Sequence, residues 1–459
     1  MQTDYLIIGA GTTGLCFADQ LLTSDPSATI AIVDRRGAPG GHWVDAYPFV
    51  ELHQPASFYG AASRSLGTDV PEADGANAGL SPLASGAEVR HHFERVLAER
   101  LLPSGRVRYL PLHEVTAEGE VRSLLSGRRS PVEVARRTVD ARYYENSIPR
   151  THTRGFAVAD GVTIVPPNDL PQAAPHHRAF VVLGGGKTGI DAMLFLLRMG
   201  ADPDQITWVV PRDPWLWARE TTQPHRSAFA ATIGAFASQM EAAAEASDPA
   251  DFALRMEGAG VWRRVDPSVT PSMFHAATCS RAEVEALRSL RRVIRAGRVR
   301  SAEPGRLVLD GGEAAVPADA LLIDCTASAI AKRPTTPIFA GDTITCQMVR
   351  FPAVSLSAAL LAHIEASLPN DDERNRFAAP VPLPDTVEDY MTTLLVGMMN
   401  QGQWRQSETI SAFLAQTRLE PAPRLMREGH DGSAAHAEIM DRIQRNVLPA
   451  MTNLARLAA

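Results

Sequence analysis

Two glycine-rich stretches have the residue types and spacing that could hold a phosphorylated cofactor. The first occupies residues 9–14, reads Gly-Ala-Gly-Thr-Thr-Gly, and follows the apolar run at residues 4–8. In such a G-x-G-x-x-G turn, Gly9 permits the tight bend, Gly11 lets the backbone approach a pyrophosphate, and Gly14 lets the next helix pack on the strand. The helical pattern that follows would point its free N–H groups at the phosphates.

An acidic residue stands where a dinucleotide site needs one. A second apolar run at residues 29–33 ends at Asp34, which lies 20 residues after Gly14 (34 − 14 = 20). At this spacing a carboxylate accepts hydrogen bonds from an adenosine ribose. Thr12 and Thr13 complete the turn that would face the phosphates. A glycine turn in an ordinary α/β domain is the alternative, and it leaves Asp34 unexplained.

The same pattern returns in the middle of the chain. The run at residues 179–183 is followed by Gly-Gly-Gly-Lys-Thr-Gly at 184–189, a helical pattern and a further β-run at 206–210. Arg212 stands where the first unit has Asp34, and an arginine can pair with a 2′-phosphate that an acid would repel. This predicts NADP rather than NAD as the second nucleotide, with a merely solvated Arg212 as the alternative. The residues of this turn expected to contact the nucleotide are Gly184, Gly186, Lys187, Thr188 and Gly189.

Composition narrows the class of protein. The chain has 459 residues and a net charge of −7 without a long basic block, which argues against nucleic acid as the main partner. No apolar run is long enough for a membrane helix, and the N-terminus has no signal-peptide pattern. The four cysteines, at positions 16, 279, 325 and 346, are scattered. We therefore expect a cytoplasmic protein with reduced thiols, no membrane association and no metal site.

The remaining pattern predicts the elements that position the two turns. Hydrophobic periodicity and turn residues predict helices at 15–22, 87–102, 190–199, 228–246, 280–295 and 355–367, strands at 107–115, 132–134, 139–141 and 318–323, and a hairpin at 306–316. The strands between 107 and 141 are expected to include a small antiparallel insert. The His91-His92 pair on the helix at 87–102 is expected to be solvated.

Together these elements predict an α/β fold with two Rossmann-like domains, the second inserted into the first, plus helical additions. The first domain would occupy residues 1–150 and return at 321–380. The second would occupy 176–320, with a helical insert at about 221–298, after a crossing at 148–175. Residues 386–459 would form a C-terminal helical segment. Trp215, Trp217, Trp262 and Phe274 flank the helical insert and could line a pocket or pack in the core.

With these residues in view, the chain resembles the two-dinucleotide-binding flavoproteins, and most of all the class B flavin monooxygenases (flavin-containing, Baeyer–Villiger and N-hydroxylating types). Gly40-Gly41-His42-Trp43 matches their Gly-Gly-x-Trp, and Tyr47-Pro48 matches the Tyr-Pro that follows. The resemblance implies FAD at the first turn and NADPH at the second. It also implies FAD contacts from Arg35, Gly41, His42, Trp43, His53 and Val115, and it places Gln54 near the family's asparagine beside the reacting part of the flavin.

Two departures bear on the chemistry. The family's linker signature, Phe-x-Gly-x-x-x-His, has no match around Gly155-Phe156 or Gly161. The Ala-Thr-Gly end of the family's late strand becomes Asp324-Cys325-Thr326-Ala327, with its glycine lost. Gln54 would act as a hydrogen-bond donor near the flavin, or it is an ordinary polar residue in a loop.

The resemblance implies an FAD-dependent oxidoreductase reduced by NADPH. Its expected reaction is insertion of one oxygen atom of O₂ into a small organic substrate through a flavin C4a-hydroperoxide. An NAD(P)H-dependent flavin reductase or dehydrogenase without oxygenation is the first alternative, and it accounts for the missing linker signature. A non-catalytic nucleotide-binding redox sensor is the second. The C-terminal segment could cover the cleft or join two copies as a homodimer.

Overall fold

In the computed structural model, which describes residues 1–328, 330 and 333–458, strands from widely separated parts of the sequence form the first sheet. Its order is β20-β21-β7-β1-β2-β3, and all neighbours are parallel except β20 and β21. The strands are β1 (Gln2–Ile8), β2 (Ile30–Asp34), β3 (Val107–Pro111), β7 (Glu133–Asp140), β20 (Phe339–Ala340) and β21 (Thr343–Thr345). Its helices are α1 (Thr12–Ser24), α2 (Gly86–Val96), α8 (Val354–Ser367) and α9 (Asp371–Phe377).

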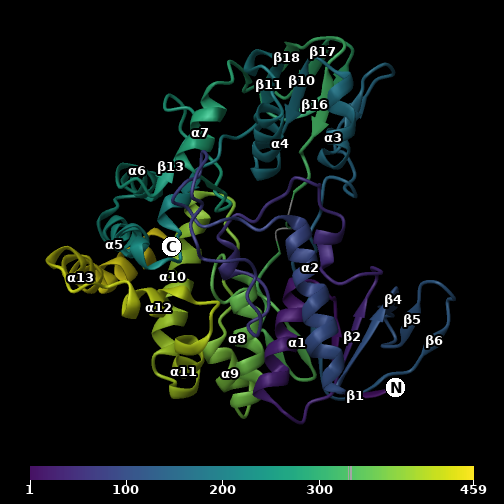
Figure 1. Cartoon of the computed structure of the whole chain (residues 1–459), viewed down its shortest axis with the longest axis vertical. Helices are drawn as coiled ribbons and strands as arrows, with labels where there is room; N and C mark the ends of the chain where they lie inside the picture. The colour runs from purple at the N-terminus through teal and green to yellow at the C-terminus, as the bar shows by residue number, and fades with distance from the viewer. Residues whose placement is uncertain (329, 331–332, 459) are drawn as a thin grey trace.

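The core of this first domain lies between the sheet and its helices. Apolar side chains of α1 and α8, including Phe17, Leu21 and Leu360, are fully buried against one another and against Ile7 of β1. Figure 1 shows α1, α2 and α8 beside this sheet, in the lower half of the molecule. A strand that is buried on both faces is apolar throughout, so the apolar run at the end of β1 predicts a buried strand from the sequence alone.

A second parallel sheet lies in the upper half of the molecule (Figure 1). Its order is β15-β11-β10-β19-β9. The strands are β9 (Ile164–Val165), β10 (Phe180–Leu183), β11 (Ile206–Val209), β15 (Arg292–Ile294) and β19 (Leu321–Asp324), and the helices are α3 (Leu170–Ala173), α4 (Lys187–Arg198) and α7 (Arg281–Arg288). In each of the two parallel sheets, one strand leads through a G-x-G-x-x-G turn into a helix. This arrangement confirms the predicted architecture of two Rossmann-like domains.

Smaller sheets and helices complete the fold. An antiparallel insert in the first domain holds β4 (His113–Val115), β5 (Val121–Ser123) and β6 (Arg129–Ser130). Beside the second sheet lie β8 (Ala157–Val158), β16 (Val299–Glu303), β17 (Arg306–Leu309) and β18 (Gly312–Ala315). The helical insert adds two further helices and a three-stranded sheet. The helices are α5 (Phe229–Glu245) and α6 (Pro249–Gly258), and the strands are β12 (Leu216–Ala218), β13 (Trp262–Arg263) and β14 (Thr278–Cys279).

The C-terminal helices pack on this helical insert. They are α10 (Val387–Trp404), α11 (Glu408–Gln416), α12 (Pro421–Glu428) and α13 (Ala434–Leu457). Helix α13 runs along α5, where Ile439 and Ile443 meet Phe229 and Ile233. Figure 1 shows this pair at the edge of the molecule, away from the first sheet. The residues that the structure describes include no helix long and apolar enough to cross a membrane.

Three sequence predictions require correction. Residues 133–140 form one strand, β7, which pairs in parallel with β1, and the antiparallel insert is confined to residues 113–130. The predicted helix at 280–295 ends at Arg288, and residues 292–294 form β15. Strand β19 pairs with β10, so the first domain resumes at β20 and not at residue 321. In each case pairing with a distant strand outweighs the local pattern.

The predicted crossing at 148–175 also contributes to the second domain, because β8 pairs with β16 and β9 pairs with β19. The all-helical reading of the C-terminal segment agrees with α10 to α13 as far as residue 458, and its last residue lies outside the described residues.

His92 is buried, contrary to the expectation of a solvated histidine pair. Its side chain lies inside the first domain, where Nε2 accepts a hydrogen bond of 3.0 Å from the backbone N–H of Ala61. Burial lowers its pKa to about 4, and the positive charges of Arg418 and Arg64 act in the same direction. Folding therefore requires the neutral imidazole.

We expect this histidine to make the protein less stable in mild acid. An unfolded chain protonates the imidazole near the ordinary pKa of 6.5, whereas the folded protein does so near 4. The stabilisation is therefore complete above pH 6.5 and is lost as the pH falls toward 4. Urea unfolding should show that His92→Gln removes about 1–2 kcal/mol of the stability difference between pH 7.5 and pH 5. The control is His91→Gln, at an exposed neighbour, which should keep the wild-type pH dependence.

Candidate active site

The first glycine turn joins β1 to α1 and opens toward a cavity. Gly9 has φ of +109°, a conformation that suits glycine, and a Cβ at Gly14 would lie 2.0 Å from the carbonyl oxygen of Gly9. At Gly11 a Cβ would meet its nearest atom, the Cα of Gly41, at 3.5 Å. Gly11 is also the N-cap of α1 and makes no side-chain cap. The free N–H groups of the helix start therefore remain available for a pyrophosphate.

Asp34, at the end of β2, is held in a fixed orientation. Its carboxylate accepts hydrogen bonds from the backbone N–H groups of Ala10 at 2.6 Å and Arg36 at 2.7 Å. The turn at Gly40 and Gly41 packs backbone to backbone on the first turn, because the N–H of Gly40 donates to the carbonyl of Ala10 at 2.8 Å. The acid and both turns thus form one preformed surface that suits the ribose and phosphates of a dinucleotide.

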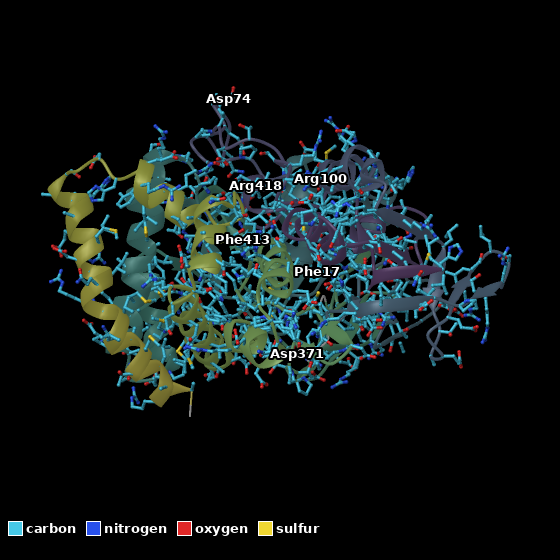
Figure 2. The ribbon with its side chains drawn as sticks, turned by 90° about the horizontal axis from the view of Figure 1, so that it is seen from below. Phe17, Asp74, Arg100, Asp371, Phe413 and Arg418 are labelled. Atoms are coloured by element: carbon cyan, nitrogen blue, oxygen red, sulfur yellow. The ribbon has the colours of Figure 1, made fainter. Side chains whose placement is uncertain are left out.

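Tyr59 is a supporting residue that the sequence analysis missed. Its hydroxyl accepts a hydrogen bond of 2.9 Å from Nε1 of Trp43 and lies 2.6 Å from Oγ1 of Thr12. Tyr59 therefore links the Gly-Gly-x-Trp segment to the first residue of α1. Its neighbours are held in turn by Arg418, which Figure 2 labels and which comes from the segment between α11 and α12.

The second glycine turn joins β10 to α4 in the same way. Gly184 has φ of +128°, and Cβ atoms at Gly184 and Gly189 would lie 2.6 Å and 2.5 Å from the carbonyl oxygens of Cys325 and Gly184. Gly186 meets no atom within 4 Å, so the turn is open at this residue. The turn therefore packs tightly on the backbone at Gly184 and Gly189, and it leaves space for a phosphate at Gly186.

Lys187 lines the cavity, and it also forms an ion pair within the protein. Its Nζ pairs with the carboxylate of Asp191 one helical turn further on, and the hydroxyl of Tyr47 donates to the same carboxylate at 2.7 Å. Burial opposes the charge of Lys187, but the Asp191 carboxylate outweighs that effect and raises its pKa. Because Tyr47 belongs to the first domain and Asp191 to α4, this cluster also joins the two domains at the cavity.

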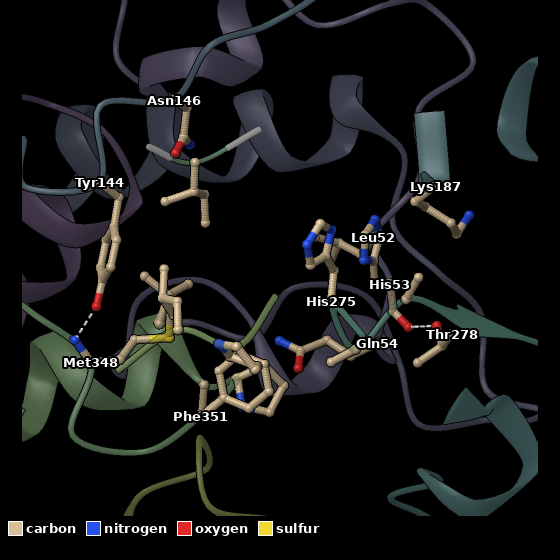
Figure 3. Close-up of a pocket in the computed structure, with 18 of the residues that line it drawn as sticks. Leu52, His53, Gln54, Tyr144, Asn146, Lys187, His275, Thr278, Met348 and Phe351 are labelled. Carbon is tan, nitrogen blue, oxygen red and sulfur yellow. Dashed lines mark hydrogen bonds between the residues drawn. The ribbon is translucent and has the colours of Figure 1, made fainter. Parts of the chain in front are cut away.

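The loop that carries His53 and Gln54 belongs to the first domain and contacts the second domain. The hydroxyl of Thr278 donates a hydrogen bond to the backbone carbonyl of His53 (Figure 3). The surrounding protein and the nearby charge of Lys187 lower the pKa of His53, so its exposed imidazole borders the cavity in the neutral form at neutral pH. Gln54 lines the same region as Tyr144 and Phe351 (Figure 3).

His42 also borders the cavity as a neutral ring. Burial, together with the charge of Arg36, lowers its pKa to about 4. Its Nδ1 lies 2.8 Å from the amide nitrogen of Asn146, a residue from the segment that follows β7. The Gly-Gly-x-Trp segment is thereby fixed from both sides.

Both turns open into one cavity with a volume of about 2110 Å³. Pockets for a single small ligand usually measure about 300–1,000 Å³. The cavity therefore has room for two nucleotides and a further molecule. The predicted site residues that line it are Gly9, Gly11, Thr12, Thr13, Asp34, Arg35, Gly41, His42, Trp43, His53, Gln54, Gly184, Gly186, Lys187, Thr188 and Arg212.

Three predicted residues have other positions. Gly14 and Gly189 lie behind the turns, where their lack of a Cβ permits helix–strand packing. Val115 is in β4, on the antiparallel insert, and packs beside the apolar cluster around Leu6 and Val121. Val115 is not among the residues that line the cavity, so its predicted FAD contact requires correction; the chain leaves the main sheet at Leu112, where φ is +56°.

The residues that the structure describes contain no group of three or more His, Cys, Asp or Glu side chains that could hold a metal ion. The four cysteines are free and buried. The polar groups that border the cavity include backbone N–H groups, hydroxyls, amides, arginines, Lys187 and carboxylates such as Asp34, a set that suits phosphates, riboses and a polar ring system.

The fold and the cavity together define a protein with two Rossmann-like domains whose glycine turns open onto one cavity. No protein-family model matches the chain. The chain is 39% identical over 457 residues to the uncharacterised protein Rv2000 of Mycobacterium tuberculosis, covering 100% of this chain and 84% of that protein. The uncharacterised protein Mb2023 of Mycobacterium bovis matches with the same values. The chain belongs to the family of these mycobacterial proteins.

Solved structures of flavin monooxygenases resemble it at low identity. Cyclohexanone monooxygenase with bound ε-caprolactone has 13% identity and a TM-score of 0.49, over 80% of this chain and 86% of that one. The S-allyl-L-cysteine S-oxygenase of Allium sativum has 14% identity and a TM-score of 0.47, over 99% of both chains. The assignment of two Rossmann-like domains rests on the strands and turns of this chain.

Proposed function

We propose that this protein is an FAD-dependent oxidoreductase reduced by NADPH, and that it transfers one oxygen atom of O₂ to a small organic substrate. The observation that carries the proposal is the single cavity onto which both glycine turns open from separate domains. An electron donor and an acceptor must lie close together for hydride transfer, and this arrangement supports that geometry.

Residues of the first domain fit FAD. The start of α1 would bind the pyrophosphate through the N–H groups around Thr12 and Thr13, and Asp34 would accept hydrogen bonds from the ribose. Gln54 has an amide N–H that could donate to the ring system. In the second domain Gly186 and Thr188 would bind the nicotinamide nucleotide. The cofactors supply the redox and oxygen chemistry when bound, so the chain needs no general base for it.

We assign the part of the cavity beside α10 and α12, here called the chamber, to an organic substrate; apolar and polar side chains line it. Helix α10 contributes Leu394 and Gly397, and the segment of α12 contributes Leu425 and Met426. Gly397 lies inside the helix, where glycine costs about 1 kcal/mol relative to alanine. A Cβ at Gly397 would meet nothing within 4 Å, so packing does not require this glycine, and its absence of a side chain enlarges the chamber.

The aromatic residues around the helical insert divide between two roles. Trp217 lines the cavity. Trp215, Trp262 and Phe274 are buried in the core around Tyr390. An apolar wall excludes water from the reacting atoms, as oxygen transfer requires. The free thiols are the state that a reducing compartment maintains, which supports the proposed cytoplasmic location.

The visible spectrum of the purified protein tests the proposal. We expect flavin absorbance that is bleached by NADPH without air and restored when air is admitted. A protein that stays colourless after incubation with FAD would overturn the assignment. A spectrum that NADPH does not change would instead favour the non-catalytic sensor.

One observation favours a reductase without oxygenation as the second candidate. The segment at 148–156, where monooxygenases carry their linker signature, is tied to Asp324 by His152 at 3.1 Å and Arg154 at 2.9 Å. These contacts with Asp324 take the place of the monooxygenase signature in this segment. Hydrogen peroxide and NADPH measured together, with O₂ as the only electron acceptor, separate the candidates: a reductase releases one peroxide for each NADPH oxidised whatever organic compound is added, whereas a monooxygenase given its substrate releases less.

A further inference from the structure

Arg212, the residue expected at a 2′-phosphate, already holds an acid. Its two terminal nitrogens bond both carboxylate oxygens of Asp385, at 2.8 Å each, in a bidentate pair. Nε2 of His275 lies 2.8 Å from one of the same oxygens. The side chains of Arg212 and Asp385 are 34% and 36% exposed, so a ligand in the cavity can reach them.

Asp385 is fixed in this position by its own backbone. Its carbonyl accepts a hydrogen bond of 2.9 Å from the N–H of Phe274, and its N–H donates to the carboxylate of Asp389 at 3.0 Å. Asp385 belongs to the segment just before α10. The C-terminal part of the chain therefore places a carboxylate beside Arg212 of the second domain. The pair is therefore part of the built wall of the cavity.

A 2′-phosphate would need the same guanidinium. Arginine binds phosphate and carboxylate through the same kind of N–H fork, and Asp385 occupies the fork formed by the two terminal nitrogens, so a phosphate must displace Asp385 or use the remaining N–H groups. A phosphate placed beside Asp385 would also experience like-charge repulsion at close range. An ordinary 2′-hydroxyl carries no charge and escapes this cost.

We propose that Asp385 is a specificity-determining residue that competes with the 2′-phosphate for Arg212 and so reduces the discrimination between NADPH and NADH. This inference rests on the proposed nicotinamide site. It implies that NADPH binds only by displacing or sharing the Asp385 carboxylate, and that the wild-type preference for NADPH is smaller than Arg212 alone would give. An exposed ion pair without influence on ligands is the alternative.

Two small probes test this without turnover. Calorimetric titration of the purified protein with 2′,5′-ADP and with 5′-AMP measures the contribution of the 2′-phosphate alone. We expect Asp385→Asn to tighten 2′,5′-ADP by about tenfold and to change 5′-AMP by less than about twofold, because Asn cannot neutralise Arg212. In the Arg212→Gln background the same substitution should tighten 2′,5′-ADP much less, because only the relief of charge repulsion remains, and it should leave 5′-AMP unchanged.

Controls separate the possible failures. Asp266 pairs with Arg295 at 3.1 Å and is similarly exposed, so Asp266→Asn should leave both probes unchanged. Asp385→Ala and thermal melts of each variant show whether a change reflects folding. If both probes bind and Asp385→Asn alters neither, or alters both equally, or tightens 2′,5′-ADP as strongly without Arg212 as with it, the inference is wrong. If neither probe binds the wild type, the nucleotide site itself is wrong.

Discussion

Replacement of Gly14 by alanine is expected to abolish flavin binding. The new Cβ would lie 2.0 Å from the carbonyl oxygen of Gly9, and because this atom belongs to the backbone, rotation of a side chain does not relieve the overlap. Helix α1 must then move away from β1, which we expect to cost about 3 kcal/mol or more. The dissociation constant for FAD should rise at least about tenfold, since a loss of about 1.4 kcal/mol in binding already gives that factor, and the ratio of FAD absorbance to protein absorbance should fall as a result.

The matched control is Gly186→Ala in the second turn. Gly186 has φ of −83° and a Cβ there meets nothing within 4 Å, so the fold tolerates alanine. This variant should melt within a few degrees of the wild type and retain its flavin, but it should bind 2′,5′-ADP more weakly because the methyl group occupies the open face of the turn. A Gly14→Ala protein with normal flavin content and melting temperature would contradict the assignment of the first turn.

Replacement of Arg418 by methionine is expected to give the second large effect. The guanidinium donates to the backbone carbonyls of Ser57 at 2.7 Å, Tyr59 at 2.8 Å and Ala61 at 2.6 Å. Burial lowers the pKa of Arg418 to about 10, so it remains charged at neutral pH. Methionine fills similar space and leaves these carbonyls without a donor. We expect urea unfolding to show a loss of about 3 kcal/mol.

Arg424 supplies the comparison for this variant. It lies in the neighbouring helix α12 and pairs with Asp69 at 2.6 Å, with its side chain 42% exposed. Arg424→Met should change the unfolding free energy by less than about 1 kcal/mol. Because Tyr59 bonds Trp43 and Thr12, the Arg418 variant should also hold flavin less tightly. Equal stability losses in the two variants would show that Arg418 has no special role.

The two glycine turns and the residues that end the next strands were predictable because they are local. A G-x-G-x-x-G run after an apolar strand determines its own conformation, and Asp34 and Arg212 follow at short separations. The structure places both residues on the cavity. The predicted fold class is confirmed for the same reason, since each βαβ unit is one continuous stretch of sequence.

Contacts between distant segments could not be predicted from one sequence. Nothing near Asp385 indicates that it will meet Arg212, and nothing near Arg418 indicates the carbonyls of residues 57–61. Strand β15 lies in a stretch that alternates charged and apolar residues as a helix does, and its pairing with β11 determines the outcome. The same holds for β7, whose mixed burial becomes clear only beside β1.

The nested order of the two domains has a consequence for synthesis. Helix α1 packs on α8, and β7 pairs with β21, yet α8 and β21 follow the whole second sheet in the sequence. A ribosome therefore releases β10 through β19 before the partners that cover α1 exist. The second domain can fold on the emerging chain while the apolar face around Phe17 still awaits Leu360, and this interval is when the nascent protein most needs a chaperone.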